Sequence, residues 1–125
     1  MSIKYSVLMS VYKKENPGFL KESIQSMLNQ TKKPNEFILI EDGPLTKELY
    51  DVIDFFCTEK PKLFNIIKLE KNVGLGPALA VGVEKARYDY IARMDSDDIS
   101  EKTRIEKEIN EFLKDKSLVI VGTNV

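Results

Sequence analysis

The sequence of 125 residues contains no histidine and only one cysteine. Without histidine, Ser-His-Asp catalysis, Cys-His catalysis and all histidine-ligated metal sites are excluded. Cys57 cannot form an internal disulfide, and we expect it to be a small core residue of a cytoplasmic protein. Any chemistry must therefore come from carboxylates, lysines, hydroxyl groups and the backbone.

Long apolar runs and an excess of charge of one sign are also absent. No stretch approaches the roughly 20 apolar residues that a membrane-spanning helix needs, and we identify no signal peptide before the first predicted strand. The formal net charge of −1 offers no bulk attraction to nucleic acid or to an anionic membrane. These absences favour a single globular domain over residues 1–125, long enough to bury a core.

Strand-like and helix-like segments alternate along the chain. The apolar patterns predict strands over residues 5–11, 36–40, 63–69, 88–94 and 118–121. The capping signals for the intervening helices are Asn16-Pro17, Thr46, Pro77 and Ser100. Val83 and Leu113 are expected on the inward faces of the last two helices. This alternation predicts an α/β fold of three layers, with a mostly parallel, Rossmann-like sheet between helices.

Three aspartates, Asp95, Asp97 and Asp98, directly follow the fourth predicted strand. Carboxylates packed so closely are costly unless a cation neutralises them, and hard oxygen ligands suit Mg²⁺ or Mn²⁺. A solvated loop before a helix N-terminus explains the same residues about equally well. A calcium-binding loop is excluded, because Ile99 and Ser100 stand where a ligand and a glycine are required.

A second acidic position, Asp42, ends the second predicted strand. Right-handed crossovers bring the carboxyl ends of parallel strands to one edge of the sheet, where open α/β sheets bind ligands. We therefore expect Asp42 and Asp97 to meet at that edge although they lie far apart in the sequence. The residues alone predict a metal-assisted phosphate site.

Five blocks of sequence, taken in order, carry a family resemblance. They cover residues 6–12, 23–31, 34–43, 72–74 and 94–98. Each block is weak alone, but the ordered set is specific and resembles the N-terminal half of family 2 (inverting) glycosyltransferases with the GT-A fold. The first two blocks, with Pro44-Leu45-Thr46, are similar to transferases of bacterial capsule, exopolysaccharide and lipopolysaccharide assembly.

The resemblance implies a role for residues in each block. The implied nucleotide-sugar site comprises Ser10, Val11, Tyr12, Glu15, Asp42, Gly74, Asp95 and Ser96. In the family, Asp42 would contact the base, and Asp95-Ser96-Asp97 matches the Asp-x-Asp motif. Asp97 together with Asp95 would hold the Mn²⁺ or Mg²⁺ that bridges the diphosphate.

The implied function is transfer of a sugar from a metal-bound nucleoside-diphosphate sugar to a surface-polysaccharide or glycolipid acceptor. A UDP-sugar is the leading expectation for the donor, and the acceptor would be a saccharide or a lipid-linked molecule. Family members carry the general base and the acceptor site on later segments, so we expect a base beyond Val125, a domain truncated at its C-terminus, and no transfer by these residues alone. The resemblance also allows a peripheral position of the full-length protein at the inner face of the membrane.

Two alternatives remain open. A sugar-1-phosphate nucleotidyltransferase has a related sheet, but the loop over residues 13–18 holds a single glycine where that class has a glycine-rich, basic loop. A non-enzymatic receiver module also suits the length and the alternation. That module needs acids after the first strand and a lone aspartate after the third, and this chain has Ser10-Val11-Tyr12 and Leu69-Glu70-Lys71 there.

Overall fold

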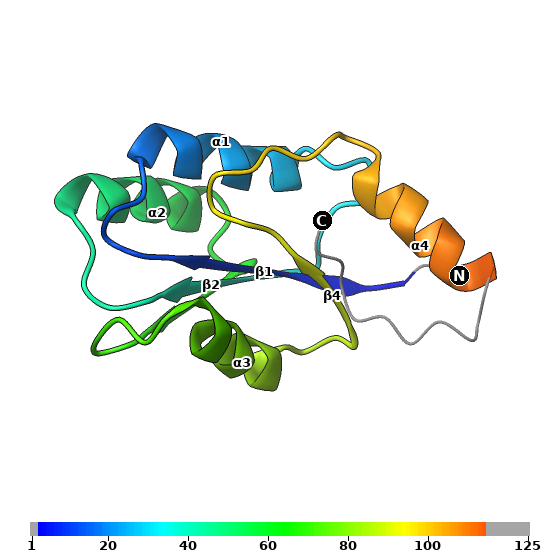
Figure 1. Ribbon diagram of the computed structural model, residues 1–125. Coiled ribbons are helices and arrows are strands. Elements are labelled where there is room, and N and C mark those ends of the chain that lie inside the picture. The colour runs from blue at the N-terminus through cyan, green and yellow to red at the C-terminus, as the bar shows by residue number, and fades with distance from the viewer. Residues whose placement is uncertain (1–2, 115–125) are drawn as a thin grey trace.

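The computed structural model describes residues 3–114, which form a four-stranded parallel sheet between two layers of helices (Figure 1). The elements in chain order are β1 (Tyr5–Val11), α1 (Pro17–Leu28), β2 (Glu36–Glu41), α2 (Lys47–Glu59), β3 (Phe64–Lys68), α3 (Leu75–Lys85), β4 (Tyr90–Arg93) and α4 (Arg104–Lys114). The strand order is β3-β2-β1-β4, and every neighbouring pair is parallel. The predicted α/β fold is confirmed, while the strand predicted at residues 118–121 lies outside the described residues.

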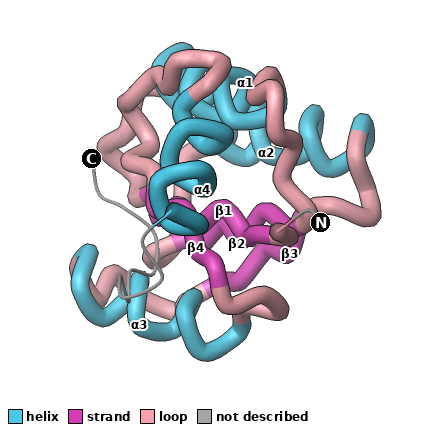
Figure 2. The backbone as a smooth tube through the Cα atoms, turned by 90° about the vertical axis from the view of Figure 1, so that its right-hand side faces the viewer, coloured by secondary structure: helices cyan, strands magenta, loops and turns pink. Residues whose placement is uncertain are grey.

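Each side of the sheet has its own apolar core. Figure 2 shows α1 and α2 on one side of the strands and α3 on the other. Alternate residues of β1, such as Val7 and Met9, pack into the larger core with α1, α2 and α4. Leu8 packs with Ile38 and Ala78 into the smaller core under α3. Because successive side chains of a strand point to opposite faces of the sheet, Ser10 lies on the α3 side with Leu8, and Asp42 lies there with Ile38 and Ile40.

The first two helices begin where the sequence predicts. The Asn16 side chain accepts hydrogen bonds from the backbone N–H groups of Gly18 (2.8 Å) and Phe19 (3.2 Å), with Pro17 as the first helical residue. Thr46 Oγ1 accepts from the N–H of Leu49 at 3.3 Å. Both side chains satisfy N–H groups that have no partner within their helix.

The last two helices differ from the prediction. Helix α3 begins at Leu75 with Gly74 as its N-cap, before Pro77, and α4 begins at Arg104 with no cap from Ser100. None of the helices in the described part of the chain is long and apolar enough to cross a membrane.

Two predicted core residues are exposed instead. Val83 is 50% exposed, because α3 turns its small residues Ala78 and Gly82 to the sheet. A β-carbon at position 82 would stand 2.2 Å from Leu8 Cδ1, so a larger residue there would require the Leu8 side chain to move. Leu113 is 46% exposed on α4, whereas Ile105 and Ile109 of the same helix are buried. Cys57 is half-buried and packs against the larger core.

Glu41 is a buried carboxylate at the end of β2, with 3% of its surface exposed. Burial raises the pKa of Glu41, the Lys68 ammonium lowers this pKa in part, and the Asp54 carboxylate raises it. Because the folded-state pKa exceeds the unfolded-state pKa, Glu41 stabilises the fold below the unfolded-state pKa. That contribution is lost as the pH rises through the folded-state pKa.

The Glu41→Gln variant should therefore be more stable than the wild type at neutral pH, by about 1 kcal/mol in the free energy of unfolding. At about pH 4 the difference should shrink, because the wild-type carboxyl is then protonated in the folded chain. Urea unfolding at both pH values measures this difference in the free energy of unfolding. Glu59→Gln, at an exposed position of α2, is the control, and an equal gain in both variants would contradict the explanation.

Candidate functional site

The carboxyl edge of the sheet borders a cavity of about 390 Å³. Ser10, Tyr12 and Glu15 line it from the end of β1 and the following loop, and Asp42 from the end of β2. Asn72 and Gly74 of the loop before α3 also line it, together with Leu75, the first residue of α3. The loop after β4 contributes Asp95, Ser96 and Asp97. The structure thus brings Asp42 and Asp97 to one cavity, as the predicted topology requires.

Asp42 is the buried polar centre of this cavity, with 4% of its surface exposed. Its Oδ1 accepts a hydrogen bond from the N–H of Val73 at 2.7 Å, and its Oδ2 accepts from the N–H of Gly74 at 3.1 Å. The Asn72 amide donates to Asp42 Oδ2 at 3.2 Å and to the Asp42 backbone carbonyl at 3.3 Å. Asp42 therefore fixes the loop that leads into α3.

Gly43 allows this loop to come so close. Its φ is +90°, in the region that favours glycine, and a β-carbon there would stand 2.7 Å from the backbone nitrogen of Asn72. Residues 42–43 and 71–74 consequently form one packed unit on the β2–β3 side of the cavity.

Glu15 and Ser96 connect the loop after β1 to the loop after β4. Ser96 Oγ donates a hydrogen bond to Glu15 Oε1, and the N–H of Asn16 donates to Glu15 Oε2 at 2.9 Å. Ser23 Oγ of α1 donates to the backbone carbonyl of Asp95 at 2.9 Å. These contacts fix the backbone on which the acidic side chains are carried.

The three aspartates form an exposed cluster, and two of them, Asp95 and Asp97, line the cavity. One carboxylate oxygen from each of Asp95, Asp97 and Asp98 lies within 4.8 Å of the others. A backbone hydrogen bond from the Asp98 N–H to the Asp95 carbonyl (3.2 Å) closes the turn that brings them together. Arg93 Nη2 lies 4.0 Å from Asp95 Oδ1. Clustered carboxylate oxygens at this spacing are chemically suited to a hard divalent cation.

Two details of the site differ from what the sequence led us to expect. Val11 does not line the cavity, because its side chain is 1% exposed within the larger core. Asn72 and Leu75 line the cavity although the sequence analysis did not select them. Asn72 stands in one of the resemblance blocks, so a signal existed for it. Leu75 stands next to Gly74 and carries no chemical signal.

Comparisons with known proteins agree with this geometry. The family model for Glycosyl transferase family 2 matches residues 6–125. The chain is 38% identical over 121 residues to the amylovoran biosynthesis glycosyltransferase AmsE of Erwinia amylovora, covering 97% of this chain and 45% of that protein. It is 45% identical over 105 residues to the Escherichia coli UDP-Gal:alpha-D-GlcNAc-diphosphoundecaprenol beta-1,3-galactosyltransferase, covering 82% of this chain and 37% of that protein.

The fold is shared with solved glycosyltransferases. The mannosyltransferase PcManGT from Pyrobaculum calidifontis, solved in complex with GDP-Man and Mn²⁺, superposes with a TM-score of 0.75 at 13% sequence identity. The superposition covers 87% of this chain and 32% of that structure. The chain spans less than half the length of the two sequence relatives. With a family match over almost all of its residues, the chain belongs to glycosyl transferase family 2.

Proposed function

We propose that this chain is the donor-binding part of a glycosyltransferase that uses a nucleoside-diphosphate sugar to build a surface polysaccharide or glycolipid. The observation that carries the proposal is the meeting of Asp42, the Glu15–Ser96 pair and the aspartate cluster around one cavity. The names of the relatives support the polysaccharide and lipid-linked classes of acceptor. In this proposal the protein acts in the cytoplasm, where nucleotide sugars would reach the cavity directly.

The base and the ribose are assigned to the inner part of the cavity. Asp42 Oδ1 accepts one backbone hydrogen bond, and a carboxylate oxygen has capacity for a second. The imide N–H of uracil supplies such a donor, and the UDP-Gal in the name of one relative favours a UDP-sugar over donors whose bases offer a similar N–H. Tyr12, which is 46% exposed at the rim, offers an aromatic face for stacking against the base. The Ser10 hydroxyl group also lines the cavity.

The diphosphate is assigned to the outer part, next to the aspartate cluster. The cluster fits a divalent cation because its exposed carboxylate oxygens are hard ligands gathered in one turn. Asp97 and Asp95 would hold Mn²⁺ or Mg²⁺, and the bound ion would stabilise negative charge on the departing nucleoside diphosphate. The presence of Mn²⁺ in the PcManGT complex supports the class of ion. The proposal assigns no general base to residues 3–114, so it covers donor binding and not transfer.

Calorimetric titration with UDP, GDP and dTDP, each with and without Mn²⁺, tests the proposal. We expect UDP to bind most tightly and Mn²⁺ to strengthen its binding by at least about tenfold. Asp97→Asn should lose that metal-dependent gain. Asp89→Asn, which neutralises an exposed aspartate just before β4 at the opposite edge of the sheet, should retain it.

UDP binding that ignores both Mn²⁺ and the Asp97→Asn substitution would exclude the aspartates as the metal-binding group. Absence of binding by any of the three nucleotides would exclude a donor site in this chain.

A further inference from the structure

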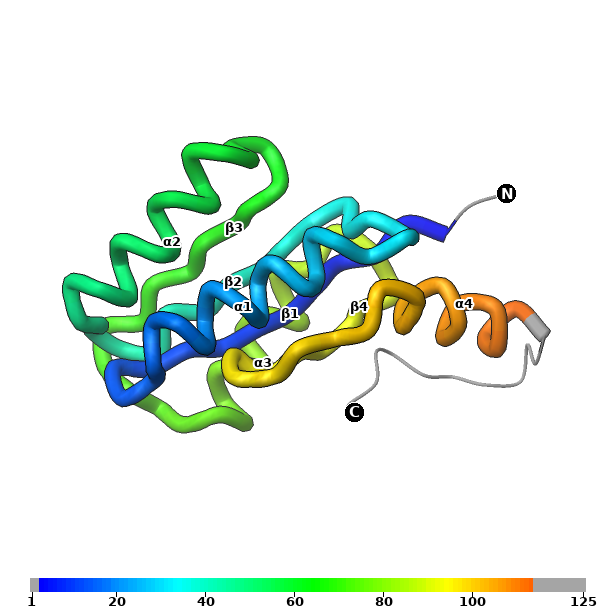
Figure 3. Tube along the Cα trace, turned by 90° about the horizontal axis from the view of Figure 1, so that it is seen from above, coloured from blue at the N-terminus to red at the C-terminus, as the bar shows by residue number. Residues whose placement is uncertain are grey.

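The segment that carries the aspartates, residues 94–103, has no regular secondary structure of its own. It leaves β4, turns at the carboxyl edge and runs back along α1 to reach α4, as Figures 1 and 3 both show. A segment of this kind would not hold three carboxylates in a fixed arrangement without contacts to its neighbours. Its position must therefore be set by side chains from outside the segment.

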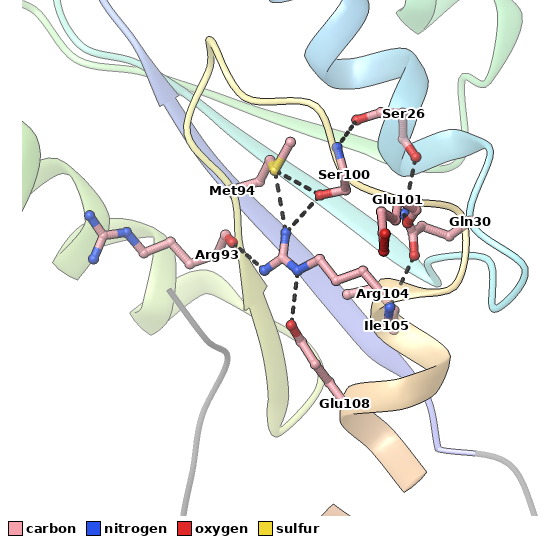
Figure 4. Close-up of polar contacts among 9 residues, drawn as sticks. All are labelled: Ser26, Gln30, Arg93, Met94, Ser100, Glu101, Arg104, Ile105 and Glu108. Carbon is pink, nitrogen blue, oxygen red and sulfur yellow. Dashed lines mark hydrogen bonds and ion pairs between the residues drawn. The ribbon is translucent and has the colours of Figure 1, made fainter. Parts of the chain in front are cut away.

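Gln30, which follows the C-cap of α1, makes three hydrogen bonds through its side-chain amide. Its side chain is fully buried. Its Nε2 donates to the backbone carbonyl of Glu101 at 2.6 Å and to that of Ser26 at 3.3 Å (Figure 4). Its Oε1 accepts from the backbone N–H of Ile105 at 3.0 Å. One amide thus joins the end of α1, the acidic segment and the first turn of α4.

Further contacts secure the segment on both sides of Gln30. The N–H of Ser100 donates to Ser26 Oγ at 3.0 Å. Arg104 reaches back from α4 with Nη2 to the Arg93 carbonyl and with Nη1 to Ser100 Oγ, both at 2.9 Å (Figure 4). With the hydrogen bond from Ser23 to the Asp95 carbonyl, the segment is anchored to α1 near its start and to α1 and α4 from Ser100 onward. Gln30 differs from the Ser26 hydroxyl, which donates to the Ser23 carbonyl of its own helix at 2.8 Å, because its amide bonds to both the segment and the first turn of α4.

We infer that Gln30 is a positioning residue for the metal-binding carboxylates. It touches none of the three aspartates and acts through the backbone of the segment at Glu101. This inference rests on the proposed function, since it concerns the affinity of the aspartates for a divalent cation. Metal ligands need their supporting contacts to keep a productive geometry, and loss of an outer contact typically weakens metal binding by about 10- to 100-fold.

The two hydrogen-bonding functions of Gln30 can be separated by substitution. Gln30→Glu keeps an acceptor for the Ile105 N–H, and a carboxylate is favourable at the N-terminus of a helix. In its ionised form the new side chain has no donor for the Glu101 carbonyl and places two oxygens against each other. A residue that only capped α4 would tolerate this change, whereas a residue that positions the acidic segment would not.

The test compares the wild type, Gln30→Glu and the matched control Gln25→Glu, which places the same change on the exposed side of α1. Mn²⁺ affinity in the presence of UDP is measured from the electron paramagnetic resonance signal of free Mn²⁺. UDP affinity without metal is measured by calorimetry. We expect Gln30→Glu to weaken Mn²⁺ binding by about tenfold or more, with metal-free UDP binding and the control unchanged. An unchanged Mn²⁺ affinity, or an equal loss of metal-free UDP affinity, would overturn the inference.

Amide hydrogen exchange over residues 95–103 provides a second, metal-independent readout. Exchange should accelerate there in Gln30→Glu and stay unchanged in Gln25→Glu, and equal exchange in both would overturn the inference. If Gln30→Glu does not fold, the apolar Gln30→Met replaces it in the same measurements. A wild-type chain that binds no Mn²⁺ with UDP would overturn the proposed function, and the exchange comparison would still decide whether Gln30 holds the segment.

Discussion

Gly43→Ala is expected to lower the free energy of unfolding by about 3 kcal/mol and to abolish UDP binding. An L-residue is strained at a φ of +90°, and the added β-carbon would stand 2.7 Å from Asn72 N and 3.1 Å from Lys71 C. Both neighbours are backbone atoms, so rotation of a side chain cannot relieve the overlap. The loop over residues 71–74 must shift. This loop carries the three groups that donate hydrogen bonds to the Asp42 carboxylate, namely the Asn72 amide and the N–H groups of Val73 and Gly74.

Gly74→Ala is the matched control for this prediction. Gly74 also has a positive φ, of 97°, but the nearest heavy atom to its added β-carbon is Pro77 Cδ at 4.0 Å. Its substitution should therefore cost only the conformational strain, about 1 kcal/mol. Urea unfolding of the two variants measures the difference. Equal destabilisation would show that the close contact between Gly43 and Asn72 contributes nothing.

The alternation of strand-like and helix-like segments along the chain made much of this fold predictable. The mostly apolar runs over residues 5–11 and 36–40 identified two strands of the sheet, and Asp42 followed the second of them. The parallel order then required Asp42 and Asp97 to share an edge. Asn16 and Thr46 were identifiable as caps because their hydrogen bonds are local.

The prediction failed where the local pattern competes with tertiary contacts. Ser100 is a good N-cap residue in isolation, but its N–H donates to Ser26 and its hydroxyl group accepts from Arg104. The start of α4 is instead supported by Gln30, 75 residues away from Ile105. Val83 fits an inward position by helical period, yet the close approach of α3 to Leu8 selects Gly82 for the sheet side. Neither result follows from a short sequence window.

The family match decides between the three functions that the residues left open. The receiver module and the nucleotidyltransferase were disfavoured by missing residues, which is weak evidence in a single sequence. The structure adds a positive reason for a glycosyltransferase, since aspartates from the loops after β2 and β4 line one cavity. A receiver module would instead need its acceptor aspartate after β3, where Leu69 and Glu70 follow.

Asp42→Ala should remove UDP binding both with and without Mn²⁺, which distinguishes it from Asp97→Asn. The substitution leaves the N–H groups of Val73 and Gly74 without their acceptor and releases the Asn72 amide. Each of these part-buried N–H groups loses a hydrogen bond to a charged acceptor, which is worth about 1.5–3 kcal/mol, so the loop before α3 should loosen from β2. The variant therefore loses the wall of the cavity as well as the carboxylate assigned to the base.

Asp42→Asn separates these two losses. Its amide retains one oxygen acceptor but turns an NH₂ group toward either the Val73 or the Gly74 N–H, so one of the two backbone hydrogen bonds is replaced by a donor–donor contact. We expect intermediate stability and a loss of UDP affinity of at least about tenfold, measured by urea unfolding and calorimetry on the same samples. An Asp42→Asn chain that is destabilised but binds UDP as the wild type does would show that Asp42 serves the loop and not the base. Full stability with lost binding would assign it to the base directly.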